Sequence, residues 1–372
     1  MKHHIQTLDG LRGIAALCVF LFHVVELIVP GPAQNAFRHA YLAVDFFFCL
    51  SGFIIGHAYD EGLAGGVCTA PTLTFRAFIV RRLVRLHPLV VVGAILGLCA
   101  YLFDPFMTAD QKEAISDLPW LVALNFGLIV CILPSPALPA SWNMTHSLNG
   151  PAWSLFQEYL VNFAYGLFGY RFSKQVLVFI AGTGVSGLLL AAMISGSLTG
   201  GWAWDNAWVG FVRVTASFTI GLLIYRLNWG FRLPFAFPVL GLGLAFIFAA
   251  PEFKPYGGVF DWLMVVFAFP AIIMLANRPE ARSRPRLDAI ARISGRLSYP
   301  LYILHYPFLY VFAHWIWQAK PNPTLLWTVA VAIMVAVPVI AWLLLILIDE
   351  PLRGWLRKIS TRPSGGAPRP IG

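Results

Sequence analysis

Charged residues are scarce in this sequence. Asp, Glu, Lys and Arg together make up 12% of the 372 residues, about half of the ~25% that is usual in soluble globular domains. Apolar residues make up 59% of the chain, and the mean hydropathy is +0.73. A water-soluble domain could not bury that much apolar surface, and a disordered chain would not carry it. The composition therefore excludes both classes of protein.

Three further possibilities are also disfavoured: a transmembrane β-barrel, a cysteine-based site and a nucleic-acid partner. The apolar segments run uninterrupted and lack the alternation of polar and apolar residues that a transmembrane β-barrel needs. The five cysteines show neither a CxxC pair nor a Cys/His spacing, so we expect no disulfide framework and no metal site. The net charge of +9 does not indicate a nucleic-acid partner, because the cations lie mostly in short loops between apolar segments, as topology determinants do.

Eleven apolar segments are candidates for membrane spans, each of which needs about 20 residues. They are 11–30, 42–59, 83–103, 119–134, 152–170, 175–195, 207–226, 235–250, 259–276, 298–317 and 325–348. The sequence predicts an all-α, polytopic membrane bundle. We expect one integral membrane domain over 1–361 and a disordered cytoplasmic tail over 362–372.

The distribution of Lys and Arg predicts the orientation of these spans. Nearly all basic loops fall on one side, the cytoplasm, only if segment 119–134 does not cross the membrane. That segment is short and is followed by the uncharged, Pro/Ser-rich stretch 134–141. We therefore predict about ten spans, one re-entrant or interfacial segment at 119–134, and both termini in the cytoplasm.

Ionisable residues inside spans indicate a functional site, because their burial in lipid is costly. The first span presents Arg12, His23 and Glu26 on one face, with His23 about 16 Å beyond Arg12 along the axis. Asp45 lies near the start of the second span. It could orient His23, as a carboxylate orients a catalytic histidine, or it could form a structural salt bridge, for instance with Arg213.

Later spans add further polar groups. Arg82 and Arg85 are neighbours on one helix where it meets the cytoplasm. Such arginines suit phosphate groups, but they also serve as plain positive-inside charge. Glu158 falls about two turns into its span, and His305 lies within segment 298–317 with Tyr302 three residues before it. A reaction centre or an ion-coupled transport pathway would explain this collection.

Five motifs occur in order along the chain: LDGLRGIAALCVFLFH, VDFFFCLSGFII, RRLVRLHPL, WSLFQE and LSYPLYILHYP. Together they resemble the acyltransferase-3 family of integral membrane O-acyltransferases. The resemblance implies a ten-span core in a bacterial inner membrane. It also implies transfer of an acyl group, most often acetyl, from acyl-CoA in the cytoplasm to a hydroxyl of a glycan or lipid-linked saccharide. No metal is implied.

The resemblance also implies roles for individual residues. His23 would be the essential catalytic histidine, preceded by the basic residue Arg12, and the Arg82/Arg85 pair would hold the phosphates of the donor. The other matching positions are Asp45, Ser51 and Gly52, then Trp153, Ser154 and Glu158, then Ser298, Tyr299, Tyr302 and His305. Among these, Ser51 is expected near the donor.

The mechanism expected from these residues is base-catalysed attack on a thioester. His23 would take the proton of the acceptor hydroxyl, oriented by Asp45 or Glu26. The developing oxyanion would be stabilised by Arg12, His305 or Tyr302, and a covalent acyl-histidine remains an alternative.

The rival interpretation is a proton-coupled transporter of a small polar or anionic solute, since intramembrane His, Asp and Glu also build proton relays. The chain shows none of the internal repeats that are typical of transporters. Release of free CoA would distinguish the enzyme from the transporter.

Overall fold

A computed structural model describes residues 5–29, 31, 34–64, 73–278 and 284–360. Its regular structure over these ranges is helical, and one isolated β-bridge joins Met144 to Ala203. The predicted all-α class is confirmed. The predicted tail 362–372 lies outside the described residues.

Each of the eleven predicted segments is helical. The uninterrupted helices are α1 (Gln6–Ile28), α2 (Ala43–Ala64), α3 (Phe75–Phe103), α5 (Pro119–Val130), α6 (Ala152–Leu167), α7 (Lys174–Ser195), α8 (Ala207–Arg226), α9 (Ala236–Phe248) and α14 (Pro323–Leu344). Two segments are interrupted and comprise α10 (Gly257–Leu263), the π-helical turn η4 (Met264–Ala268) and α11 (Phe269–Ala276), then α12 (Pro285–Leu304) and α13 (Tyr306–Ala319). The remaining elements are η2 (Ala40–Leu42), α4 (Ala109–Ser116), η3 (Gly169–Arg171), the π-helical turn η5 (Leu345–Asp349) and α15 (Glu350–Ser360).

Fewer helices are long enough to span a membrane than the sequence predicts spans. Seven of the described helices are long and apolar enough to cross a membrane, or eight if α4 and α5 count as one bent span. The predicted count of about ten is therefore approximate, because α6 and α9 are short and α12 and α13 are separated by a break. The 79° bend between α4 and α5 fits a broken span as well as the re-entrant segment that we expected.

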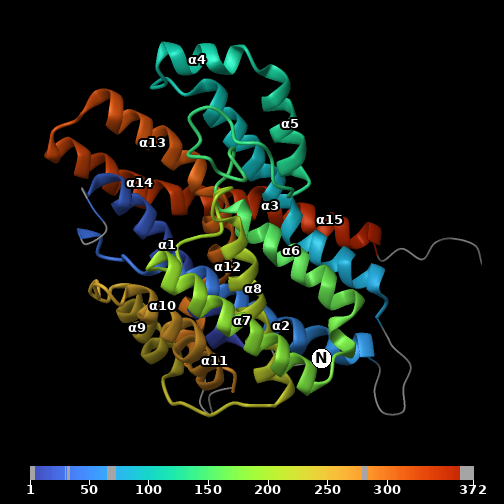
Figure 1. Ribbon diagram of the computed structural model, residues 1–372. Helices are drawn as coiled ribbons and strands as arrows, with labels where there is room; N and C mark the ends of the chain where they lie inside the picture. The colour runs from blue at the N-terminus through green and yellow to red at the C-terminus, as the bar shows by residue number, and fades with distance from the viewer. Residues whose placement is uncertain (1–4, 30, 32–33, 65–72, 279–283, 361–372) are drawn as a thin grey trace, which may run out of the picture.

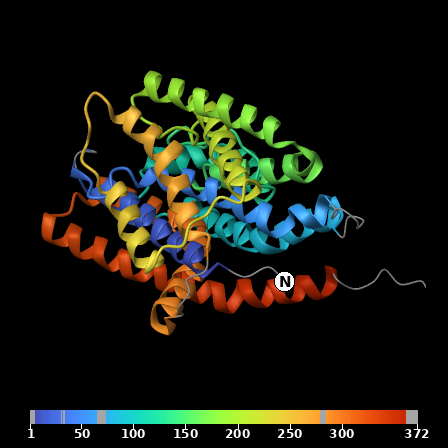
Figure 2. The same ribbon diagram turned by 90° about the horizontal axis from the view of Figure 1, so that it is seen from below.

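Helix α1 lies inside the bundle and packs along α12, while α2 packs along α8 and α7 covers α8 (Figure 1). Helices α14 and α15 form one long rod on one side of the bundle, with α7 on the opposite side (Figure 2). These contacts bring the first motif of the chain against the last one. The apolar outer faces of the helices stay exposed on the bundle and would contact lipid.

Glycines let the central helices approach at backbone distance, as small residues do in membrane bundles. A Cβ built on Gly13 of α1 would lie 2.4 Å from the carbonyl carbon of Ser294 on α12. On the other helix pair, a Cβ on Gly221 of α8 would lie 1.8 Å from the carbonyl oxygen of Cys49 on α2. Neither contact can be relieved by moving a side chain, so each fixes the register of its helix pair.

We predict that Gly221→Val destabilises the protein by about 3 kcal/mol or more, because the overpacked contact is with backbone. Thermal melting of the protein purified in detergent measures this. Gly182→Val is the matched control: Gly182 also lies within a helix, α7, and nothing stands within 4 Å of its Cβ position. Equal melting temperatures for the two variants would contradict the prediction.

Candidate functional site

A cavity of about 690 Å³ lies between α1, α2, α3, α6, α12 and α15. Its lining carries seven arginines and three carboxylic acids. The arginines are Arg12, Arg82, Arg85, Arg292, Arg296, Arg353 and Arg357, and the acids are Asp9, Glu158 and Glu350. We call this space the arginine cavity. Its excess of guanidinium groups suits a ligand with several phosphates.

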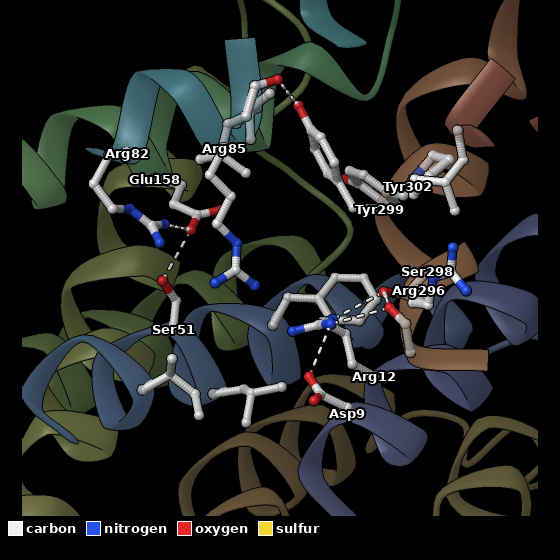
Figure 3. Close-up of a pocket in the computed structure, with 18 of the residues that line it drawn as sticks. Asp9, Arg12, Ser51, Arg82, Arg85, Glu158, Arg296, Ser298, Tyr299 and Tyr302 are labelled. Carbon is white, nitrogen blue, oxygen red and sulfur yellow. Dashed lines mark hydrogen bonds and ion pairs between the residues drawn. The ribbon is translucent and has the colours of Figure 1, made fainter. Parts of the chain in front are cut away.

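Three of the predicted residues meet on one wall of this cavity (Figure 3). Glu158 Oε1 accepts a hydrogen bond from Arg82 Nη2 at 2.6 Å and another from Ser51 Oγ at 2.9 Å. These side chains come from α6, α3 and α2, so the contact ties three helices together. Glu158 thus fixes the guanidinium of Arg82, which is itself buried.

Arg85 lies one helical turn beyond Arg82, and its guanidinium points into the cavity (Figure 3). It makes no hydrogen bond or ion pair with any residue that the structure describes. A guanidinium that stands unpaired beside other arginines is a ready partner for an anionic ligand.

Arg12 is held on the opposite wall by α12 (Figure 3). Its Nε donates to Ser298 Oγ at 2.8 Å, its Nη2 donates to the carbonyl oxygen of Gly295 at 3.0 Å, and Asp9 Oδ1 lies 2.9 Å from Nη2. The 11 residue steps from Arg12 to His23 span about 16 Å of helix. Arg12 therefore belongs to the cavity and lies well away from His23.

The cavity becomes less charged along α12. From Arg292 to Tyr302 this helix advances by about 15 Å, and the inner end is formed by Phe47, Ser154 and Tyr302. The hydroxyls of Tyr302 and Ser154 are hydrogen-bonded at 2.7 Å. A long ligand with phosphates among the arginines would reach this hydroxyl-bearing end with its other terminus.

One turn beyond Tyr302, two histidines stack on each other. The rings of His23 and His305 are 5.5 Å apart between centroids, with 23° between their planes. His305 stands at the break between α12 and α13, is fully buried, and donates from Nδ1 to the carbonyl oxygen of Leu301 at 3.0 Å. Its Nε2 has no partner among the described residues. In the neutral form this Nε2 carries a lone pair and can only accept.

His23 is partly exposed and is paired with an acid of its own helix. Its Nδ1 lies 3.2 Å from Glu26 Oε2, and Glu26 is 53% exposed. His23 does not line the arginine cavity. The stacked histidines therefore lie between the inner end of that cavity and a more open region beside Glu26.

Asp45 has a different partner from the one that we expected. Its carboxylate accepts three hydrogen bonds from Arg213, the shortest at 2.6 Å, and both side chains are fully buried. Arg213 also donates to the carbonyl oxygens of Tyr41 and Gly200. The prediction that Asp45 orients His23 is wrong, because a guanidinium already engages both carboxylate oxygens. The alternative of a structural salt bridge holds.

Four cavity arginines were missed because they fall outside the predicted spans, among the basic residues that were assigned to the cytoplasmic side. They lie on α12 and α15, which begin earlier or extend further than the predicted spans: Arg292, Arg296, Arg353 and Arg357. Their spacing of four residues within each pair is a helical spacing and could have revealed them.

Comparison with known proteins identifies the chain at the family level. Residues 5–345 match the acyltransferase-3 family, described as an acyltransferase domain. The protein named "Protein 2 in picA locus" from Rhizobium radiobacter is 37% identical over 194 residues, which cover 50% of this chain and 93% of that protein. No solved structure matches the chain. The matched residues include both His23 and His305 and most of the residues that line the arginine cavity.

We predict that Asp45→Leu and Arg213→Met each cost about 3–5 kcal/mol of stability, because each leaves an unpaired charge in a buried site. The double variant recovers part of the loss, since it buries no charge. Thermal melting of the three variants measures this coupling. Additive losses in the double variant would contradict a direct ion pair.

Proposed function

Because the chain belongs to the acyltransferase-3 family of membrane acyltransferases, we propose that it transfers a short acyl group, acetyl in the simplest case, from acyl-CoA to a hydroxyl of a saccharide. The observation that carries the proposal is the arginine cavity, whose inner end lies one turn from the stacked histidines His23 and His305. The family match supports the enzyme over the transporter.

The donor would lie along the cavity. Its phosphates would bind Arg85, which is otherwise unpaired, together with Arg82 and Arg12, which Glu158 and Ser298 hold in place. Arginine forks suit phosphates because they donate two parallel hydrogen bonds. The pantetheine arm would run along α12 toward Tyr302, so that the thioester reaches the hydroxyl-bearing end of the cavity.

The histidine pair would supply the base. Glu26 can hold the Nδ1–H of His23, which leaves the Nε2 lone pair of His23 free to take a proton. As His23 takes the proton of the acceptor hydroxyl, the oxygen attacks the thioester carbonyl and a tetrahedral intermediate forms. The C–S bond then breaks, the ester is released, and the CoA thiolate recovers the proton from the imidazolium.

Of the three groups expected to stabilise the oxyanion, Tyr302 fits best. Its hydroxyl can donate and lies at the inner end of the cavity. Neutral His305 offers only a lone pair there, and Arg12 is held among the phosphate-binding groups. His305 would instead support His23 by stacking.

We further propose that the arginine cavity opens to the cytoplasm of a bacterium, where acyl-CoA is made, and that both termini lie on that side of the inner membrane. The arginine-rich ends of α3, α12 and α15 converge on this cavity. Clustered Arg on one side of a membrane bundle is the usual mark of its cytoplasmic side.

The direct test uses membranes that contain the wild type or His23→Ala, with radiolabelled acetyl-CoA and a glycan extract of the host. We expect the wild type to form an alkali-labile glycan ester and His23→Ala to form it at least about 100-fold more slowly. His57→Ala, a histidine on α2 outside the cavity lining, is the matched control. Label that stays on the protein before acceptor is added would indicate the covalent alternative. Equal transfer by wild type and His23→Ala would refute the assigned base.

Arg85→Gln should raise the KM for acetyl-CoA by about 10- to 100-fold, as expected for the loss of hydrogen bonds to a charged group. Initial rates at varied acetyl-CoA measure this. Arg81→Gln, on the same helix but outside the cavity lining, should leave the KM unchanged. If both variants behave alike, the phosphates bind elsewhere.

A further inference from the structure

A row of aromatic side chains leads from His23 to the protein surface, away from the arginine cavity. Successive ring centroids lie 5.2 Å apart from His23 to Tyr306, 5.1 Å from Tyr306 to Tyr310, 5.5 Å from Tyr310 to Trp142, and 5.7 Å from Trp142 to Trp317. Trp317 is 50% exposed. We call these four aromatic residues after His23 the aromatic row.

The outer end of the row lies a membrane thickness from the phosphate-binding arginines. Trp317 contacts His314, whose Nδ1 lies 2.6 Å from Asp104 Oδ2 at the end of α3. Asp104 is 22 residues beyond Arg82, which corresponds to about 33 Å of helix, and a bilayer core is about 30 Å thick. Helix α13, which carries most of the row, runs away from α12 toward this end (Figure 1). The row therefore ends on the face opposite to the donor cavity.

The backbone that positions Trp142 is conformationally costly. Trp142 and Asn143 both have left-handed backbone angles, with φ of 52° and 55°, which bulky residues rarely adopt. Hydrogen bonds hold this turn: Trp204 N–H donates to the carbonyl oxygen of Asn143 at 3.2 Å, and Met144 N–H donates to that of Ser141 at 3.1 Å. Strain of this kind is typical of ligand sites.

A polar group without a partner lies beneath the outer end of the row. His314 is buried, and its Nε2 has no hydrogen-bond partner among the described residues, while Asp104 occupies its Nδ1. A buried polar atom without a partner is unfavourable unless a ligand or a water satisfies it. It offers a hydrogen bond to a hydroxyl group that approaches over Trp317.

We propose that Trp142 and Trp317 bind a sugar ring of a neutral saccharide acceptor, and that Tyr310 and Tyr306 line the way from there to His23. Rigid, amphipathic rings with a few polar groups at their edges suit a ligand that is apolar on its faces and hydroxylated at its rim. We take the acceptor to be neutral for two reasons. None of the four residues of the aromatic row is a cation, and the inner end of the row lies beside the carboxylate of Glu26, which pairs with His23. This inference rests on the proposed function.

The test measures acceptor kinetics with the purified full-length protein in lipid nanodiscs. Acetyl-CoA is held at saturation, and neutral oligosaccharides of four to six sugars are the acceptors. We expect Trp317→Ala and Trp142→Ala to raise the acceptor KM about tenfold or more and to leave the KM for acetyl-CoA unchanged. Trp142→Phe should keep most of the affinity. Trp327→Ala, on α14 and 47% exposed, is the matched control and should change neither constant.

Acetyl-CoA binding and thermal melting check that each variant is folded, and the exposed Trp317 carries the test if Trp142→Ala does not fold. An acceptor KM that stays at the wild-type value in folded Trp317→Ala would overturn the proposal. Wild-type transfer to a lipid alcohol but to no saccharide would also overturn it, while leaving acyl transfer intact. Absence of CoA release with every acceptor would instead refute the proposed function, and this inference with it.

Discussion

The backbone contact between α1 and α12 is the constraint on which the rest of the site depends. Gly13 allows α1 to lie against Ser294 so closely that no side chain fits between them. That register places Arg12 on Ser298 and Gly295 at one end, and it stacks His23 on His305 at the other. One helix pair thus aligns Arg12, the proposed donor-binding group, and His23, the proposed base, about 16 Å apart. Neither position could shift without moving the other.

Ion pairs between helices hold several charged groups of this protein in place. Asp45 is bound by Arg213 and Asp60 by Arg226, and each pair joins helices inside the bundle. In the arginine cavity, Arg85 is exposed, faces open space and has no such partner among the described residues. Its guanidinium is therefore available to an anion that enters the cavity.

The sequence predicts what depends on local pattern. Apolar length located the long helices, and the motifs singled out Arg82, Ser51 and Glu158, which the structure brings together on one wall of a cavity. It could not choose the partner of Asp45, because Arg213 is 168 residues away and only the packing of α2 on α8 brings it near. The aromatic row escaped notice for a related reason: Trp142 joins it through a left-handed turn that has no periodic signature.

In the proposed reaction, donor and acceptor enter from opposite faces of the membrane and meet at His23. Proteoliposomes test it most directly, with labelled acetyl-CoA added outside only and a neutral oligosaccharide placed either outside only or in the lumen only. We predict labelled ester when the saccharide is in the lumen and little when it is outside, whichever way the proteins insert. Product formed only with the external saccharide would contradict the claim, because both substrates would then enter from one face.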